Sequence, residues 1–185
     1  MTSAGRSDHR LLEDRVVLVT GGASGLGLGM ATAMAAHGAA VVLACRRPET
    51  GEPAAAGLRE AGHDARCVRC DVTSADELLA AVDSAVEAHG RLDCMVHNAI
   101  APPGAPARLE DVTQDHWDAM VATAIRATFD GARAAHRHLR AVGGSMIIMT
   151  SSSGMEGSAN LAVYAMVKAR SEEHTSELQS RSDLV

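Results

Sequence analysis

Tyr164 and Lys168 are the first candidates for chemistry, because they are the single tyrosine and the single lysine of the 185-residue chain. They lie four residues apart where a helix is predicted to begin, and this spacing places them on one helix face. A phenol with its ordinary pKa of about 10 is a poor base at neutral pH, but a neighbouring ammonium favours the phenolate. Ser151, thirteen residues before Tyr164 at the end of a predicted strand, adds a hydroxyl. This combination suits proton transfer to or from an oxygen of a bound molecule.

A glycine-rich turn follows the first predicted strand, residues 15–20, and opens a predicted helix over residues 26–37. The turn reads Thr20-Gly21-Gly22-Ala23-Ser24-Gly25-Leu26-Gly27. Gly21 permits a tight turn, Gly25 lets the backbone approach phosphate groups, and Gly27 allows close packing of the helix. Because the helix N-terminus adds unpaired N–H groups and a positive dipole end, the turn predicts a site for the pyrophosphate of a dinucleotide.

Apolar runs that suit strands alternate with helical patterns along the chain. The predicted strands cover residues 15–20, 39–45, 65–71, 91–98 and 144–150. The predicted helices cover residues 26–37, 52–61, 74–89 and 114–140, with Ser74 as the N-cap and Gly90 as the stop of the third. Strands that are apolar on both faces and separated by helices indicate a parallel sheet covered on both sides, a doubly wound α/β fold. We expect one domain over residues 14–169, preceded by a polar extension of residues 1–13.

The G-x-x-x-G-x-G spacing of the turn resembles the motif of the short-chain dehydrogenase/reductase family. Three further matches follow in chain order: Asp71-Val72 is similar to the family's adenine-contacting pair, His97-Asn98-Ala99 to its N-N-A-G turn, and Ser151 with Tyr164 and Lys168 to its Ser/Tyr-x-x-x-Lys pattern. The resemblance spans about residues 14–169 and implies a Rossmann-type doubly wound parallel sheet.

The resemblance also implies an NAD(P)-dependent enzyme that interconverts a carbonyl and a secondary alcohol. Tyr164 would be the acid/base, Lys168 would assist it and hold the nicotinamide ribose, and Ser151 would polarise the substrate oxygen. Ser152 and Ser153 are close neighbours, but the spacing to Gly154 and Tyr164 selects Ser151. The residues expected to bind the cofactor are Thr20, Gly21, Ser24, Gly25, Leu26, Gly27, Arg46, Asp71, Val72, Asn98, Ala99, Tyr164 and Lys168.

The end of the second predicted strand bears on the choice of dinucleotide. In dinucleotide-binding folds a carboxylate at this position hydrogen-bonds the ribose of NAD, whereas an arginine accommodates the extra phosphate of NADP. Here Cys45 stands at the position, followed by Arg46 and Arg47, whose guanidinium groups suit a phosphate. We therefore expect NADP rather than NAD, with Arg46 as the contact; the alternative is a pair of solvated surface arginines.

Departures from the family pattern at three positions leave other functions open. Ala124 stands where the family commonly has an asparagine that supports the lysine through water, and Ile100 stands where it has glycine. His97 replaces the first asparagine of its turn and is expected to be a turn or core histidine rather than a catalyst. The alternatives are a dinucleotide-binding or regulatory protein without turnover, and a different reaction on the same site, such as epimerisation or double-bond reduction.

Composition restricts the partners. The net charge is −6, and the arginines are scattered, so we expect a small-molecule substrate rather than nucleic acid or a membrane. The first fifteen residues lack the apolar core of a secretory signal, which favours a cytoplasmic protein whose four cysteines are reduced thiols. Cys67 and Cys70 form a C-x-x-C, whose alternative interpretation is a redox or half-zinc motif.

The composition changes at residue 170, because the last sixteen residues contain neither alanine nor glycine. Their string RSEEHTSELQS is similar to the translation of a common sequencing adapter, so we expect residues 170–185 to be foreign to the fold. The resemblance then implies a C-terminally truncated chain that lacks a sixth strand and a substrate lid and is not necessarily active. It also implies that the parent protein is a homo-oligomer.

Overall fold

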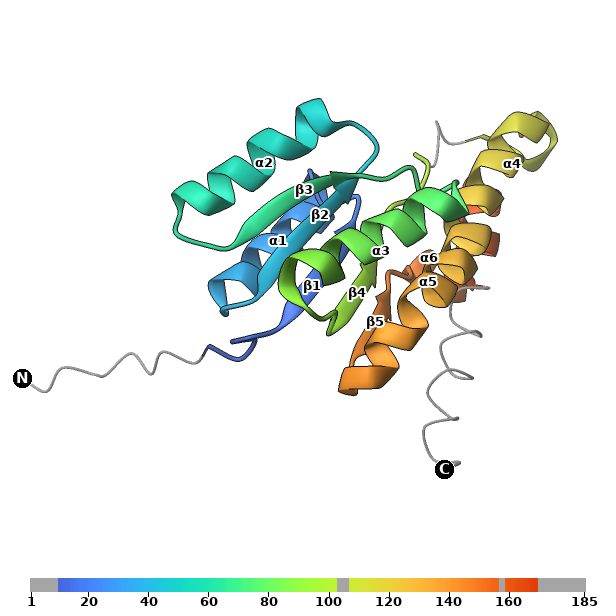
Figure 1. Ribbon diagram of the computed structural model, residues 1–185. Helices are drawn as coiled ribbons and strands as arrows, with labels where there is room; N and C mark the ends of the chain where they lie inside the picture. The colour runs from blue at the N-terminus through green and yellow to red at the C-terminus, as the bar shows by residue number, and fades with distance from the viewer. Residues whose placement is uncertain (1–9, 103–106, 157–158, 170–185) are drawn as a thin grey trace, which may run out of the picture.

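A five-stranded parallel sheet forms the centre of the computed structural model, which describes residues 10–102, 107–156 and 159–169 (Figure 1). The strands are β1 (Val16–Thr20), β2 (Ala40–Cys45), β3 (Ala65–Arg69), β4 (Cys94–His97) and β5 (Ser145–Ile148). Their order across the sheet is β3-β2-β1-β4-β5, and every neighbouring pair is parallel. All five predicted strands are present, and the predicted doubly wound fold is confirmed.

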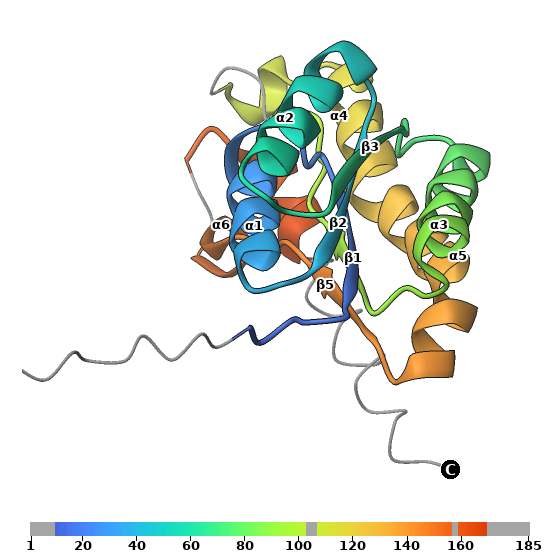
Figure 2. The ribbon, with the colours of Figure 1, turned by 60° about the vertical axis from the view of Figure 1, so that its left-hand side comes forward.

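Helices cover both faces of this sheet. Helices α1 (Gly25–Ala36) and α2 (Pro48–Glu60) pack on one face, and α3 (Ala75–His89) and α5 (Ala127–Val142) pack on the other (Figure 2). Alternate residues of a strand point to opposite faces, so Val17 and Val19 join the first layer while Val16 and Leu18 join the second. This two-sided burial explains why the strands read as continuous apolar runs.

The helix boundaries agree with the sequence prediction in some places and differ in others. Helix α3 has the predicted caps: the Ser74 side chain accepts a hydrogen bond from the Glu77 N–H, and Gly90 is left-handed. Helix α2 begins at Pro48, earlier than predicted, because proline suits the first turn of a helix. The short elements η1 (Leu109–Asp111) and α6 (Ser152–Glu156) were not predicted.

The helix predicted over residues 114–140 is present without a break, but it contains a π-helical turn. It consists of α4 (Gln114–Val121), a π-helical turn η2 (Ala122–Arg126) and α5. Thr123, within the turn, donates from its hydroxyl to the Ala119 carbonyl and accepts from the Ala101 N–H. The helix is thereby tied to the loop after β4, and apolar periodicity could not have revealed this local change in hydrogen bonding.

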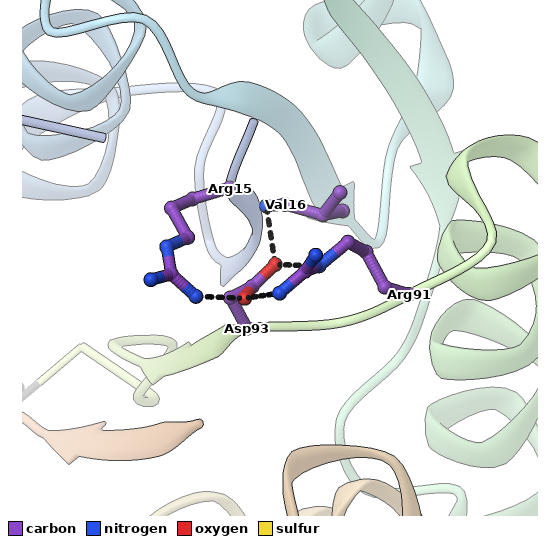
Figure 3. Close-up of polar contacts among 4 residues, drawn as sticks. All are labelled: Arg15, Val16, Arg91 and Asp93. Atoms are coloured by element: carbon purple, nitrogen blue, oxygen red, sulfur yellow. Dashed lines mark hydrogen bonds and ion pairs between the residues drawn. The ribbon is translucent and has the colours of Figure 1, made fainter. Parts of the chain in front are cut away.

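A buried carboxylate joins β1 to β4 at the amino edge of the sheet (Figure 3). Asp93 accepts hydrogen bonds from Arg15, from both Nε and Nη2 of Arg91, and from the backbone N–H of Val16, at 2.6–3.0 Å. Burial alone would raise the pKa of Asp93, but these hydrogen bonds outweigh it and hold the pKa below its ordinary value. The carboxylate is therefore ionised at neutral pH and aligns the starts of the two central strands.

Candidate functional site

The segments predicted to carry function lie at one edge of the sheet. The glycine turn follows β1, Arg46 follows β2, Asp71 follows β3, Asn98 follows β4 and Ser151 follows β5. Parallel strands end at the same edge, so these loops share it. The strand order reverses between β1 and β4, and ligands of open α/β sheets bind outside the carboxyl ends of the strands at such a switch point.

The glycine turn has backbone conformations that side chains rarely adopt. Gly21 and Gly25 have φ values of +65° and +52°. A Cβ atom at Gly27 would overlap the carbonyl oxygen of Gly21, whereas a Cβ at Gly25 would meet no atom within 4 Å. Gly27 thus allows α1 to begin directly against the turn, and Gly25 leaves open space in front of it. The cradle fits a bulky anion such as a pyrophosphate.

Thr20 and Asn98 hold the turn in place from beneath. The Thr20 hydroxyl is fully buried, donates to the Val96 carbonyl and accepts from the backbone N–H groups of Asn98 and Ala99. The Asn98 amide donates in return to the Thr20 carbonyl at 3.0 Å. These predicted site residues therefore lock the end of β1 to the end of β4.

Three other residues of the turn face solvent. Ser24, Gly25 and Leu26 are exposed, and Ser24, the N-cap of α1, makes no side-chain capping hydrogen bond. The first turn of α1 also contains no acidic residue. The positive end of this helix is thus accessible to an anion and is not opposed by a nearby carboxylate.

Arg46 lies exposed between β2 and α2 on the same edge. Asp71 accepts hydrogen bonds from the backbone and hydroxyl of Thr73, and these lower its pKa, with a further effect from the charge of Arg46. Val72 is buried in the core layer below. The ends of β2 and β3 therefore present a cation beside a carboxylate.

Tyr164 and Lys168 are on a helical segment, residues 162–169, as predicted. The Lys168 ammonium is buried, donates to the Met149 carbonyl just after β5 and lies 5.9 Å from the centre of the Tyr164 ring. Burial lowers the pKa of Lys168. Gly154 of α6 packs directly against the backbone at Lys168, so the segment that follows Ser151 touches the tyrosine and lysine helix.

A cavity of about 230 Å³ opens beside Tyr164. It is lined by Ala107 and residues 111–113 and 116 on one side, and by residues 160–164 on the other. Val112 and Val163 contribute apolar surface to the wall of this cavity, and Thr113 and His116 contribute polar groups. Only Tyr164 among these residues was predicted as a site residue, because the loop before α4 contains no motif that would reveal its contact with the Tyr164 segment.

Two of the departures from the family pattern, Ala124 and His97, have different structural settings. Ala124 is buried in η2 and packs with Val163 and Val167, on the helical segment that carries Tyr164. His97 is 4% exposed, and its Nε2 lies 3.3 Å from the Thr123 carbonyl. Burial lowers the pKa of His97 to about 4, so the ring is neutral at pH 7. His97 is therefore a core histidine, as predicted.

Within residues 10–102, 107–156 and 159–169, no three His, Cys, Asp or Glu side chains gather as metal ligands would. Across the same ranges, none of the helices combines the length and apolar character needed to cross a membrane.

The parallel sheet and its glycine turn define a doubly wound α/β protein, and comparison with known proteins gives its family. The family model described as short chain dehydrogenase matches residues 15–182, and the chain belongs to that family. The match extends past residue 170, so the assignment of residues 170–185 to a foreign tail stays a prediction about residues outside the described ranges.

Two curated relatives are similar over most of the chain. Cis-4-hydroxycyclohexanecarboxylate dehydrogenase of Sinomonas cyclohexanicum is 39% identical over 84% of this chain, and cyclopentanol dehydrogenase of Comamonas sp. is 35% identical over 85%. The chain spans 62% of the length of each. A crystal structure of NAD+-bound xylitol dehydrogenase superposes with a TM-score of 0.81 at 31% identity, covering 85% of this chain and 61% of the other.

Proposed function

We propose that this protein is an NADP(H)-dependent oxidoreductase that interconverts a carbonyl and a secondary alcohol, with Tyr164 as the acid/base. The observation that carries the proposal is the buried Lys168 ammonium beside the Tyr164 ring, at the sheet edge that also holds the glycine turn. The Met149 carbonyl fixes this ammonium, so a cation lies beside a phenol that can donate or accept a proton at the same edge of the sheet.

The residues around the glycine turn suit a nicotinamide dinucleotide. The N-terminus of α1 and the open space at Gly25 would hold the pyrophosphate. Exposed Arg46 would bind the 2′-phosphate of NADP, since Cys45 offers no carboxylate to the ribose of NAD. Asp71 and Val72 would contact the adenine. NADPH supplies the hydride when it is bound.

Three side chains would act at the substrate oxygen. Tyr164 gives a proton to the oxygen during reduction and removes it during oxidation. Lys168, whose ammonium lies beside the Tyr164 ring, would hold the nicotinamide ribose. Ser151 donates its hydroxyl hydrogen to the same oxygen and polarises the carbonyl.

The substrate class we propose is a small alicyclic alcohol or ketone. Two relatives bear names that specify a ring alcohol, a hydroxycyclohexanecarboxylate and cyclopentanol. The cavity beside Tyr164 has a volume of about 230 Å³, which suits a single small ring, and its apolar wall suits a hydrocarbon skeleton. His116 at its rim is a candidate partner for a polar substituent.

The test follows NADPH consumption by absorbance with cyclopentanone and cyclohexanone as substrates. We expect turnover by the unchanged chain, its loss in Tyr164→Phe with NADPH affinity largely retained, and loss of both in Lys168→Ala. Ser151→Ala should reduce the rate strongly, whereas the matched control Ser153→Ala should not. Near-normal turnover by Tyr164→Phe would show that another group transfers the proton.

A second candidate is a dinucleotide-binding protein without turnover, which the buried alanine at position 124 favours. NADPH binding by the unchanged chain, together with no reduction of a broad panel of ketones and aldehydes, would select this function over the first. The same measurement thus separates the two.

A further inference from the structure

The thiols of Cys45 and Cys67 are in contact, although twenty-one residues separate them in sequence. Cys45 is the last residue of β2, Cys67 is in the middle of β3, and their Sγ atoms are 3.3 Å apart. Cys45 is buried, and Cys67 is partly exposed. Cys70, the C-x-x-C partner of Cys67, is buried in the opposite core layer. The sequence motif therefore does not form a pair, and the sheet creates a different one.

The thiol pair lies directly beneath the start of α2. A Cβ atom at Gly51 would overlap both sulfur atoms, so this glycine lets the helix rest on them. The Cys45 thiol also donates to the Arg47 carbonyl at 3.4 Å. The pair thus supports the backbone between β2 and α2, the segment that presents Arg46.

We propose that Cys45 and Cys67 form an oxidisable dithiol, a modification site that a hydroperoxide converts into an intramolecular disulfide. The two S–H bonds and the O–O bond of the hydroperoxide break, and an S–S bond forms. The sulfur atoms are oxidised, the peroxide oxygens are reduced, and one alcohol and one water leave with the two thiol hydrogens.

Strand register makes this disulfide strained and easily reduced. The backbone partner of Cys45 is Arg69, so Cys67 lies two residues from the position directly opposite. Closing the bond brings the sulfur atoms from 3.3 Å to about 2.05 Å and displaces β3, which is an edge strand and pairs with β2 alone. Strained disulfides have more oxidising potentials and open readily with thiol reductants.

The reaction is expected to be slow at neutral pH. Burial raises the pKa of Cys67 to about 12, with the hydrogen bond and charge of Cys45 acting in the same direction. Because the thiolate is the reactive form, the rate should rise about tenfold for each unit by which the pH is raised toward this pKa. Contact between the two sulfur atoms offsets the small fraction of thiolate. Once the first thiol has reacted with the hydroperoxide, the second thiol already lies beside the oxidised sulfur.

Oxidation should weaken NADPH binding, a consequence that rests on the proposed function. The disulfide removes the Cys45 thiol hydrogen that the Arg47 carbonyl accepts, and it moves the sulfur atoms under Gly51. Arg46 lies between Cys45 and Arg47 in sequence. We therefore expect a several-fold increase in the Kd for NADPH that a thiol reductant reverses.

The test treats the full chain with cumene hydroperoxide at pH 7 and pH 9, blocks the remaining thiols and digests it with trypsin. Cleavage after Arg46, Arg66 and Arg69 separates Cys45, Cys67 and Cys70 onto different peptides. We expect a reducible cross-link between the peptides of Cys45 and Cys67, faster at pH 9, absent in Cys67→Ser and retained in the control Cys94→Ser. Absence of that cross-link in the folded protein at both pH values, or an equal yield of Cys45–Cys70, would overturn the proposal.

The NADPH titration of the oxidised chain is a separate measurement. If the cross-link forms and NADPH affinity falls, the dithiol and its effect on the cofactor are both supported. If the cross-link forms in a chain that binds no NADPH before oxidation, the proposed function fails while the dithiol stands. A cross-linked chain with unchanged NADPH affinity would refute the link to Arg46.

Discussion

Replacing Asp93 by alanine should destabilise the fold, although Asp93 lies at the opposite edge of the sheet from the candidate site. Asp93 is 6% exposed and is the acceptor for the buried N–H of Val16 at the first residue of β1. A buried donor left without an acceptor costs about 1–3 kcal/mol. The side chains of Arg15 and Arg91 are 49% and 37% exposed, so water solvates both guanidinium groups when Asp93 is absent. The lost ion pairs therefore add little to the destabilisation. We expect the free energy of unfolding to fall by about 2 kcal/mol, or about 4–8 °C in Tm.

The assay is urea unfolding followed by circular dichroism, with Asp83→Ala as the matched control. Asp83 also pairs with an arginine, Arg137, but its side chain is 37% exposed, so its removal should change stability by less than about 0.5 kcal/mol. A loss in Asp93→Ala no larger than the loss in Asp83→Ala would refute the assignment of Asp93 as the connector of β1 and β4.

The same carboxylate predicts how stability depends on pH. The pKa of Asp93 is lower in the folded protein than in the unfolded chain, so its contribution is present above the unfolded value of about 3.9 and is lost as pH falls through the folded value. Unfolding measured between pH 7 and pH 3 should show a steeper loss of stability below about pH 4 in the unchanged protein than in Asp93→Asn. If stability falls equally steeply below pH 4 in the two proteins, the predicted direction of the pH effect is wrong.

Three further predictions concern the cofactor site and the chain end. Arg46→Ala should weaken NADPH binding and narrow its preference over NADH in fluorescence titrations, with Arg47→Ala as the comparison; equal affinities in the unchanged protein would refute the NADP assignment. Gly27→Ala should abolish NADPH binding and lower stability, because its Cβ meets the backbone of Gly21, whereas Gly29→Ala, with open space around it, should do neither. Retained binding in Gly27→Ala would show that the turn does not hold the pyrophosphate. Deleting residues 170–185 should change Tm little, and a large cooperative loss would show that the matched residues up to 182 pack natively.

The fold was largely predictable because its signals are local. Strands buried on both faces must be apolar throughout, and each predicted run corresponds to a strand of the sheet. The caps of α3 were predictable for the same reason, since Ser74 and Gly90 act on their own helix ends. The π turn η2 was not, because Thr123 and its partners Ala119 and Ala101 leave no periodic signal.

The candidate site was predictable only where a motif fixes a backbone position. Gly21, Gly25 and Gly27 could be interpreted from residue type, because each conformation or contact tolerates no side chain. Thr20 was predicted as a cofactor-binding residue because it begins the glycine-turn motif, but its buried role beneath the turn was not predictable. The contact between Cys45 and Cys67 depends on the register of two strands, which residue spacing along one strand does not contain.

Contacts at both ends of β1 and β4 support the glycine turn. Asp93 aligns the starts of β1 and β4, and the Thr20 hydroxyl with the Asn98 amide joins their ends. Because the strands are only five and four residues long, a shift at the amino edge is transmitted along them to the carboxyl edge. The glycine turn depends on both connections, since Gly27 packs against the Gly21 carbonyl and the Asn98 amide together. Loss of Asp93 should therefore weaken NADPH binding as well as stability, whereas loss of Arg46 should weaken NADPH binding alone.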